Sequence, residues 1–308
     1  MDAITCLDVG FQGQPGLVAC GLLPCPDGIA LVDPGPASSL AGLYAGLRRL
    51  RLSIADVRAI LITHIHLDHS GGAGVIVRQQ PDVEVYVHER GAPHVVNPRR
   101  LLQSASQVYG DRMESLWGEV AAVPASNVRP IAGGERLQIA GRPVEVAYTP
   151  GHAMHHVSYL DAGTGTAFTG DVGGMCVGGA RLVVPPTPPP DVDVELWEAS
   201  VAGIRAWRPR RLLISHFGFV DAPGPHLDEL MARLRRTAAL VRESLALDGR
   251  DADRLAWFRR AVGADLRLSL SEADAADIER GVMLDSSWQG LARYWRRRST
   301  GSCPDSSP

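Results

Sequence analysis

The sequence contains no lysine, so all 31 of its basic residues are arginines. This absence excludes Schiff-base chemistry through a lysine amine, and it leaves arginine, histidine, hydroxyl and backbone amide groups to bind any anion. No run of 18 apolar residues occurs, so we expect no transmembrane helix. Because residues 1–5 lack the basic start and apolar core of a signal peptide, we expect a cytoplasmic protein.

Cysteine gives no sign of a disulfide framework. The five cysteines are scattered, odd in number and never spaced as Cys-x-x-Cys, which favours reduced thiols. The net charge of −3 gives no sign of a protein that binds nucleic acids or membranes. With 45% hydrophobic and 21% charged residues, the 308-residue chain has the composition of a globular protein that can bury a large core.

The most informative stretch places four potential metal ligands within six residues: His64, His66, Asp68 and His69. An apolar run at 59–62 precedes it and predicts a buried strand, so the cluster lies where a strand ends. Imidazole and carboxylate groups are ligands of zinc, and also of iron or manganese. In an extended chain His64 and His66 point to one side, whereas Asp68 and His69 can face a second point. The stretch therefore predicts a site for two metal ions.

Further motifs follow a recognisable order. They are Asp33-Pro34-Gly35 after an apolar run, Thr149-Pro150-Gly151-His152, Phe168-Thr169-Gly170-Asp171, and His216 at the end of the apolar run 212–214. Together with the histidine cluster, these motifs resemble the HxHxDH signature and ligand order of the metallo-β-lactamase superfamily over about residues 27–216. The resemblance implies an α/β fold, a four-layer αβ/βα sandwich with metals at one edge of its sheets.

The resemblance also implies seven metal ligands and two divalent ions, zinc in the first place, with iron or manganese as alternatives. The first ion would be held by His64, His66 and His152. The second would be held by Asp68, His69 and His216, with Asp171 as a bridge between the ions. Asp68 is in addition expected to take part in catalysis. Such a carboxylate bridge is typical of the glyoxalase II-like thioesterases, lactonases and phosphodiesterases of the superfamily, and not of its lactamases.

These residues predict a hydrolase that uses a metal-bridging hydroxide to attack a small-molecule thioester, ester or lactone. A phosphodiesterase on the same fold is one alternative. Another is a persulfide dioxygenase with a single iron, for which the resemblance implies the ligands His64, His152 and Asp171. We expect no nucleic-acid partner, because no basic platform for RNA is present.

Other residues are expected to support the ligands or to contact substrate. Asp33 and His156 are candidates for hydrogen bonds to ligand histidines. Tyr109 and Arg112, three residues apart on an expected helix, and His155 are candidates for the wall of a substrate pocket. The alternative for that helix is that Trp117 packs inward while Arg112 lies in water. The proline-rich segment 185–190 is either a stiff lip of the cleft or a connector.

Two halves of alternating strands and helices each carry part of the ligand set. We expect helices at about 38–50, after 72, at 89–96, 99–119 and 193–207. We expect strands within 1–36 and at 83–87, 128–131, 135–148, 156–161 and 166–170. Residues 1–223 would form the catalytic domain, and 224–298 a wholly helical extension that caps the cleft, forms a homo-oligomer or pads the core. Residues 299–308 are expected to be disordered.

Overall fold

Two six-stranded sheets form the centre of the protein in a computed structural model, which describes residues 3–177, 182–268, 270–273, 275–276 and 284–300. The first sheet contains, in spatial order, β1 (Thr5–Asp8), β2 (Ala19–Cys25), β3 (Gly28–Val32), β4 (Val57–Leu61), β5 (Glu84–His88) and β6 (Val128–Ile131). The second contains β14 (Gly218–Val220), β13 (Arg211–Ile214), β10 (Thr166–Phe168), β9 (Val157–Asp161), β8 (Arg142–Tyr148) and β7 (Arg136–Ile139).

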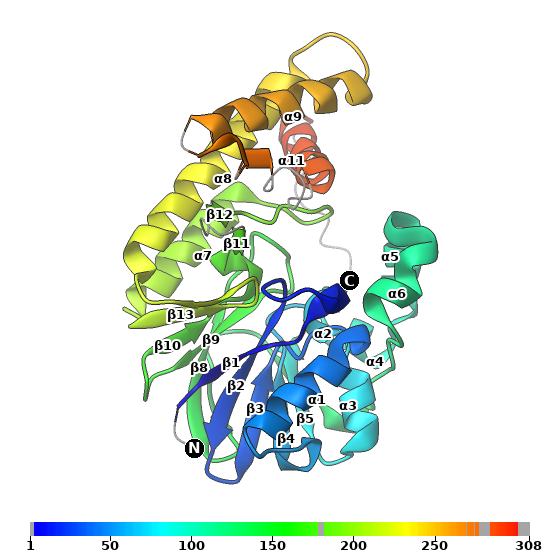
Figure 1. The fold of residues 1–308 in the computed structure, drawn as a ribbon, viewed down its shortest axis with the longest axis vertical. Coiled ribbons are helices and arrows are strands. Elements are labelled where there is room, and N and C mark those ends of the chain that lie inside the picture. Colours follow the sequence, from blue (N-terminus) through cyan, green and yellow to red (C-terminus); the bar gives the residue numbers. More distant parts are fainter. Residues whose placement is uncertain (1–2, 178–181, 269, 274, 277–283, 301–308) are drawn as a thin grey trace.

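Helices cover the outer face of each sheet, as Figure 1 shows. The helices α1 (Leu40–Arg49) and α3 (Ala73–Gln79) pack on the first sheet, and α7 (Val194–Ala206) and α8 (Pro223–Leu245) pack on the second. Strand β4 shows why the layers form, because its alternate side chains are buried on both faces. Ile60 joins the core under α1 and α3, whereas Leu61 joins the core between the sheets. The expected four-layer α/β sandwich is thereby confirmed.

Short elements cross over one end of the first sheet between β5 and β6. They are α4 (Ala92–Val96), α5 (Arg99–Tyr109), the 3₁₀ turn η4 (Gly110–Arg112) and α6 (Met113–Trp117). The single helix expected at 99–119 is therefore wrong. Gly110 has a φ of 53°, a left-handed conformation that interrupts the helix directly after Tyr109.

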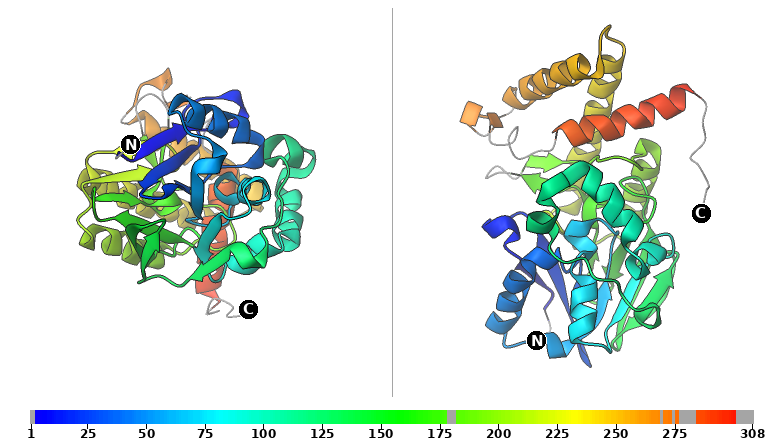
Figure 2. Two further views of the ribbon diagram at one scale, coloured as in Figure 1. Left: turned by 90° about the horizontal axis from the view of Figure 1, so that it is seen from below. Right: turned by 90° about the vertical axis from the view of Figure 1, so that its right-hand side faces the viewer.

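The C-terminal helices α8, α9 (Asp251–Arg267) and α11 (Leu284–Ser299) lie at one end of the sandwich, as Figures 1 and 2 show. Phe258 of α9 and Trp288 of α11 belong to the same buried cluster as Leu212 of β13, so these helices share a core with the second sheet. The helical extension is confirmed, but it is not wholly helical, since 246–250 separates α8 from α9. The division into domains at residue 223 stays a prediction.

Two other boundaries differ from expectation. The single strand expected at 135–148 is a hairpin of β7 and β8, because Ala140 and Gly141 both adopt left-handed φ angles, 46° and 82°. The disordered tail was expected to start at 299, but Ser299 is the last residue of α11 and the Thr300 amide donates to the Arg296 carbonyl. The rest of that expected tail, 301–308, lies outside the described residues.

Candidate metal centre

Seven histidine and aspartate side chains converge where strands of both sheets end. Within the described residues they fall into two groups, which we call site 1 and site 2. Site 1 consists of His64, His66, His152 and Asp171. Site 2 consists of Asp68, His69 and His216. The first histidines follow β4, Asp68 and His69 lie on α2 (Leu67–Ser70), and His216 follows β13, so carboxyl ends of strands supply ligands from two sheets.

Site 1 is built from three imidazoles and one carboxylate oxygen. The Nδ1 atom of His66 lies 2.9 Å from Nε2 of His64 and 2.9 Å from Nε2 of His152. The Oδ2 atom of Asp171 lies 3.4 Å from Nε2 of His152 and 3.9 Å from Nε2 of His64. These spacings are those expected between ligand atoms that share one ion with bonds of about 2 Å.

Site 2 receives the other oxygen of the same carboxylate. The Oδ1 atom of Asp171 lies 3.2 Å from Nε2 of His69 and 3.5 Å from Nε2 of His216. The Oδ2 atom of Asp68 lies 3.4 Å from Nε2 of His216. Oδ1 of Asp171 is buried and has no hydrogen-bond partner among the described residues. A buried carboxylate oxygen without a donor fits a cation.

The remaining ring nitrogens fix how four ligand histidines face the sites. His69 Nδ1 lies 2.9 Å from Asp33 Oδ2, His152 Nδ1 lies 2.8 Å from the Pro186 carbonyl, and His216 Nδ1 lies 2.7 Å from the Leu17 carbonyl. His64 Nδ1 lies 3.1 Å from the Thr63 hydroxyl. Because each Nδ1–H donates to an oxygen, each Nε2 is the atom available to a metal.

Asp33 organises several of these contacts from behind the ligands. Its Oδ2 accepts hydrogen bonds from the Thr63 hydroxyl at 2.7 Å, His69 at 2.9 Å and the Ser215 hydroxyl at 2.8 Å, and its Oδ1 accepts from the Thr63 amide at 2.8 Å. Thr63 precedes His64 and Ser215 precedes His216, so one buried carboxylate fixes three ligand segments. The structure thus places Asp33 where the sequence predicts a supporting residue.

The two sites differ in charge. Burial lowers the pKa of His64 well below its ordinary value and that of His66 to about 3, so site 1 offers neutral imidazoles. Burial opposes a charge on His69 as well, but the Asp171, Asp68 and Asp33 carboxylates raise its pKa well above the ordinary value. Site 2 therefore attracts positive charge, and a divalent ion there would replace the proton of His69.

The turn η6 (Gly170–Gly173), which carries Asp171, is held on several sides. The Trp197 indole donates to the Val172 carbonyl at 3.0 Å. His156, the other expected supporting residue, stacks on His64 at 5.1 Å and accepts from the Val172 amide at 3.5 Å. A Cβ on Gly170 would lie 2.5 Å from the Thr63 hydroxyl, so only glycine allows this close approach.

The centre opens to solvent beside Asp68, whose side chain is 26% exposed, whereas the side chains of His64 and His69 are fully buried. The expected pocket residues, Tyr109, His155 and Arg112, differ in how far they are buried. Burial and the Asp68 carboxylate raise the pKa of Tyr109 to about 12, so its phenol keeps the proton. The His155 ring lies 5.8 Å from that of His66. Arg112 is exposed, and its place in the pocket wall stays a prediction.

Several positioning groups are absent from the sequence prediction. The carbonyls of Leu17 and Pro186 orient His216 and His152, and Trp197 holds the Asp171 turn. No side-chain motif marks a carbonyl, so these two contacts have no signal in the sequence. The proline-rich segment, expected as a lip or a connector, supplies an acceptor to a ligand histidine.

Comparison with known proteins agrees with this geometry. The chain matches the profile of the metallo-beta-lactamase superfamily over residues 13–217. The chain belongs to the metallo-β-lactamase superfamily. The resemblance inferred from the HxHxDH stretch is therefore confirmed. Superfamily members are mostly metal-dependent hydrolases, which supports a metal-binding enzyme.

Individual relatives are distant. A metallo-beta-lactamase fold-containing protein, ST1585, from Sulfurisphaera tokodaii is 27% identical over 66% of this chain and 74% of its own. A hydroxyacylglutathione hydrolase from a Synechococcus species is also 27% identical, over 68% of this chain and 69% of its own.

Among solved structures, a metallo-beta-lactamase family protein from Thermus thermophilus, TTHA1429, is similar with a TM-score of 0.69, at 20% identity, over 96% of this chain and 93% of its own. That similarity extends through the C-terminal helices and establishes the fold alone. Among the described helices, none combines the length and the apolar character needed to cross a bilayer.

Proposed function

We propose that this chain is a binuclear metal-dependent hydrolase that cleaves a small thioester, ester or lactone. The observation that carries the proposal is the orientation of Asp171, whose two oxygens face two different groups of ligands. A mononuclear site would need only His64, His152 and Asp171, and it would leave the second group of ligands without a purpose. Zinc suits this set of nitrogen and oxygen ligands, and iron or manganese suits it as well.

Two divalent ions bound there would supply a water of lowered pKa and a Lewis acid for the scissile carbonyl. The chain's own residues orient and enclose the reaction. The buried Asp33 fixes the ligand rings, which prevents them from turning away from the centre. Asp68 lies beside the ligand His216, and its side chain is partly exposed to solvent. We therefore assign Asp68 a catalytic role as the carboxylate that accepts a proton next to the reacting group.

The substrate class is supported by the relatives and by the opening. Hydroxyacylglutathione is a thioester, and a hydrolase of that name matches over two thirds of this chain. Tyr109 would donate a hydrogen bond to the bound substrate, His155 would line the opposite side near His66, and Arg112 would attract an anionic group at the rim. Since the chain has no lysine, arginine is the only permanently charged side chain for that purpose.

The test is metal content per chain combined with a panel of thioester, ester, lactone and phosphodiester substrates. We expect two metals per chain, hydrolysis of the first three classes, and loss of hydrolysis in Asp68→Ala and Asp171→Ala. Asp82→Ala changes an exposed aspartate in the turn between α3 and β5, outside the ligand set, and should hydrolyse like the wild type.

Cleavage of the phosphodiester alone would make the protein a phosphodiesterase. One iron per chain, no hydrolysis and oxygen uptake with a persulfide would replace the proposal with the dioxygenase. A cytoplasmic location and assembly through the C-terminal helices stay predictions, which fractionation of the source cells and light scattering would test.

A further inference from the structure

The helix α8 contacts the turn that carries the bridging Asp171. The buried His226, in the first turn of α8, lies with its Nε2 2.8 Å from the Gly173 carbonyl, two residues after Asp171. One turn further along α8, Leu230 packs on the next residue, since a Cβ on Gly174 would lie 2.7 Å from Leu230 Cδ1. The first turns of α8 therefore hold Gly173 and Gly174, which follow Asp171 in the chain.

The helix α11 reaches the same centre by a different route. Its backbone at Gly290 lies directly against the proline-rich segment, because a Cβ there would lie 2.2 Å from the Thr187 carbonyl oxygen. Thr187 is fully buried. The preceding residue, Pro186, provides the carbonyl that accepts the Nδ1 hydrogen of His152 at 2.8 Å. A displacement of α11 would therefore move the acceptor that orients a ligand of site 1.

We infer that the C-terminal helices α8 and α11 are positioning elements of the metal centre, through His226 and through Gly290 against the Pro186 segment. The inference rests on the proposed binuclear function. His69 and His216 of site 2 are held from the N-terminal half instead, by Asp33 and by the Leu17 carbonyl. The helices thus govern His152 of site 1 and the shared Asp171, whereas the N-terminal half governs His69 and His216 of site 2.

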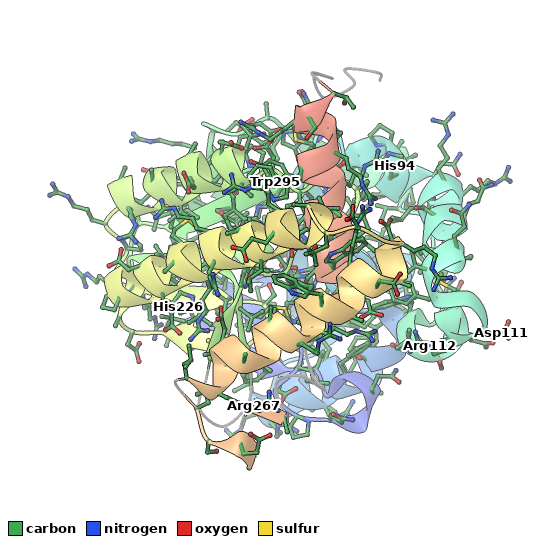
Figure 3. All side chains as sticks on the ribbon, turned by 90° about the horizontal axis from the view of Figure 1, so that it is seen from above. His94, Asp111, Arg112, His226, Arg267 and Trp295 are labelled. Carbon is green, nitrogen blue, oxygen red and sulfur yellow. The ribbon has the colours of Figure 1, made fainter. Side chains whose placement is uncertain are left out.

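The position of His226 separates this role from substrate contact. Figure 3 shows His226 and Arg112 on opposite sides of the molecule. His226 is buried and pairs with a backbone carbonyl, so we infer that it acts on the reaction through the turn that it holds. It is a positioning residue, and its removal should appear in metal affinity before any substrate is added.

The test measures zinc affinity of the metal-free full chain by competition with a chelator, together with the visible spectrum of the cobalt-loaded protein. His226→Leu removes the donor, and His226→Gln keeps an N–H that can reach the carbonyl. Gly290→Ala pushes α11 from the proline-rich segment. Ser244→Ala is the matched control, because Ser244 is a buried residue of α8 that bonds the Trp288 indole of α11 and lies away from η6.

We expect His226→Leu to weaken zinc binding 10- to 100-fold and to alter the cobalt spectrum, as removal of such supporting contacts does elsewhere. His226→Gln should recover most of the affinity. Gly290→Ala should lower the affinity for one of the two zinc ions more than for the other, because His152 belongs to site 1 alone. Ser244→Ala should lose stability yet keep both affinities.

Wild-type affinity in both His226→Leu and Gly290→Ala would overturn the inference. An equal loss of affinity in Ser244→Ala would also overturn it, because any loosening of the helices would then suffice. These outcomes differ from failure of the proposed function, in which the wild-type chain itself would bind fewer than two metals or hydrolyse none of the substrates.

Discussion

Substitution of Asp33 by asparagine tests the most connected residue of the site. Asn keeps the size of the side chain and tolerates the left-handed backbone at this position, where φ is 51°. However, one carboxylate oxygen becomes an amide that cannot accept. If the remaining oxygen of the new side chain accepts from Thr63 Oγ1, His69 and Ser215, the NH2 group of that side chain faces the Thr63 N–H, and two donors then meet. If it faces that N–H, three donors lose their acceptor.

The expected loss of stability follows from the number of donors that lose their acceptor. At least one buried donor loses its partner, at a cost of about 1–3 kcal/mol, and the bond from His69 loses its charge assistance, at about 1 kcal/mol. We expect the free energy of unfolding of the metal-free protein to fall by about 2–4 kcal/mol. We expect zinc affinity to fall about 10- to 100-fold, because the orientation of His69 and His216 loosens.

Urea unfolding followed by circular dichroism gives the first quantity, and chelator competition gives the second. Asp161→Asn is the matched control, since Asp161 is an equally buried carboxylate in β9, outside the ligand set. It should lose stability without losing zinc affinity. Zinc affinity in Asp33→Asn within about twofold of the wild type would refute the assigned role of Asp33.

Three further predictions concern stability. Asp161 accepts two hydrogen bonds from Arg142, each at 2.9 Å, so Asp161→Asn should cost about 3 kcal/mol at pH 7. Burial opposes the ionisation of Asp161, but hydrogen bonds from Arg142 and Thr164 hold its pKa below the ordinary value. The stability lost in Asp161→Asn is therefore full above about pH 4 and shrinks as the pH falls. Urea unfolding that gives the same loss at pH 7 and pH 3 would contradict this. Gly151 has a φ of 134°, and a Cβ there would lie 2.4 Å from Trp197 Cα, so Gly151→Ala should lower the free energy of unfolding by about 2 kcal/mol. In the control Gly203→Ala, in α7, the new Cβ would have nothing within 4 Å, so the free energy of unfolding should stay unchanged or rise slightly. Equal effects of the two substitutions on thermal unfolding would argue against the close contact at Gly151. Chelation should lower the melting temperature, because an ion at 100 times its Kd contributes about 2.7 kcal/mol, and calorimetry without a shift would speak against a metal-binding native state.

Much of the fold and the candidate site follows from local sequence patterns. The strand before His64 ends in the apolar run 59–62, and the ligand types appear at the ends of such runs, so the sequence predicts both the elements and the metal chemistry. The resemblance adds the layer order, which strand and helix patterns alone do not determine. Left-handed residues account for two errors, since Ala140 and Gly110 break elements that their neighbours would continue.

What the sequence leaves out depends on tertiary contact. The Leu17 carbonyl lies 199 residues from His216, and no pattern of side chains reports such a pairing. His226 resembles any isolated histidine in a helix until its partner carbonyl is known. Trp197 fits a simple core position in α7, and only the structure shows its indole bonded to the turn of Asp171.

The ligands of site 2 also have a consequence for the architecture of the chain. His69 and His216 come from opposite sheets and from segments 147 residues apart. A metal that binds both closes that long loop, as a disulfide would, and by chain entropy alone such a closure stabilises a protein by about 5 kcal/mol. No disulfide joins the four cysteines in the described part of the chain. The centre would therefore serve as a reversible cross-link between the two sheets, one that opens with chelators and not with reductants.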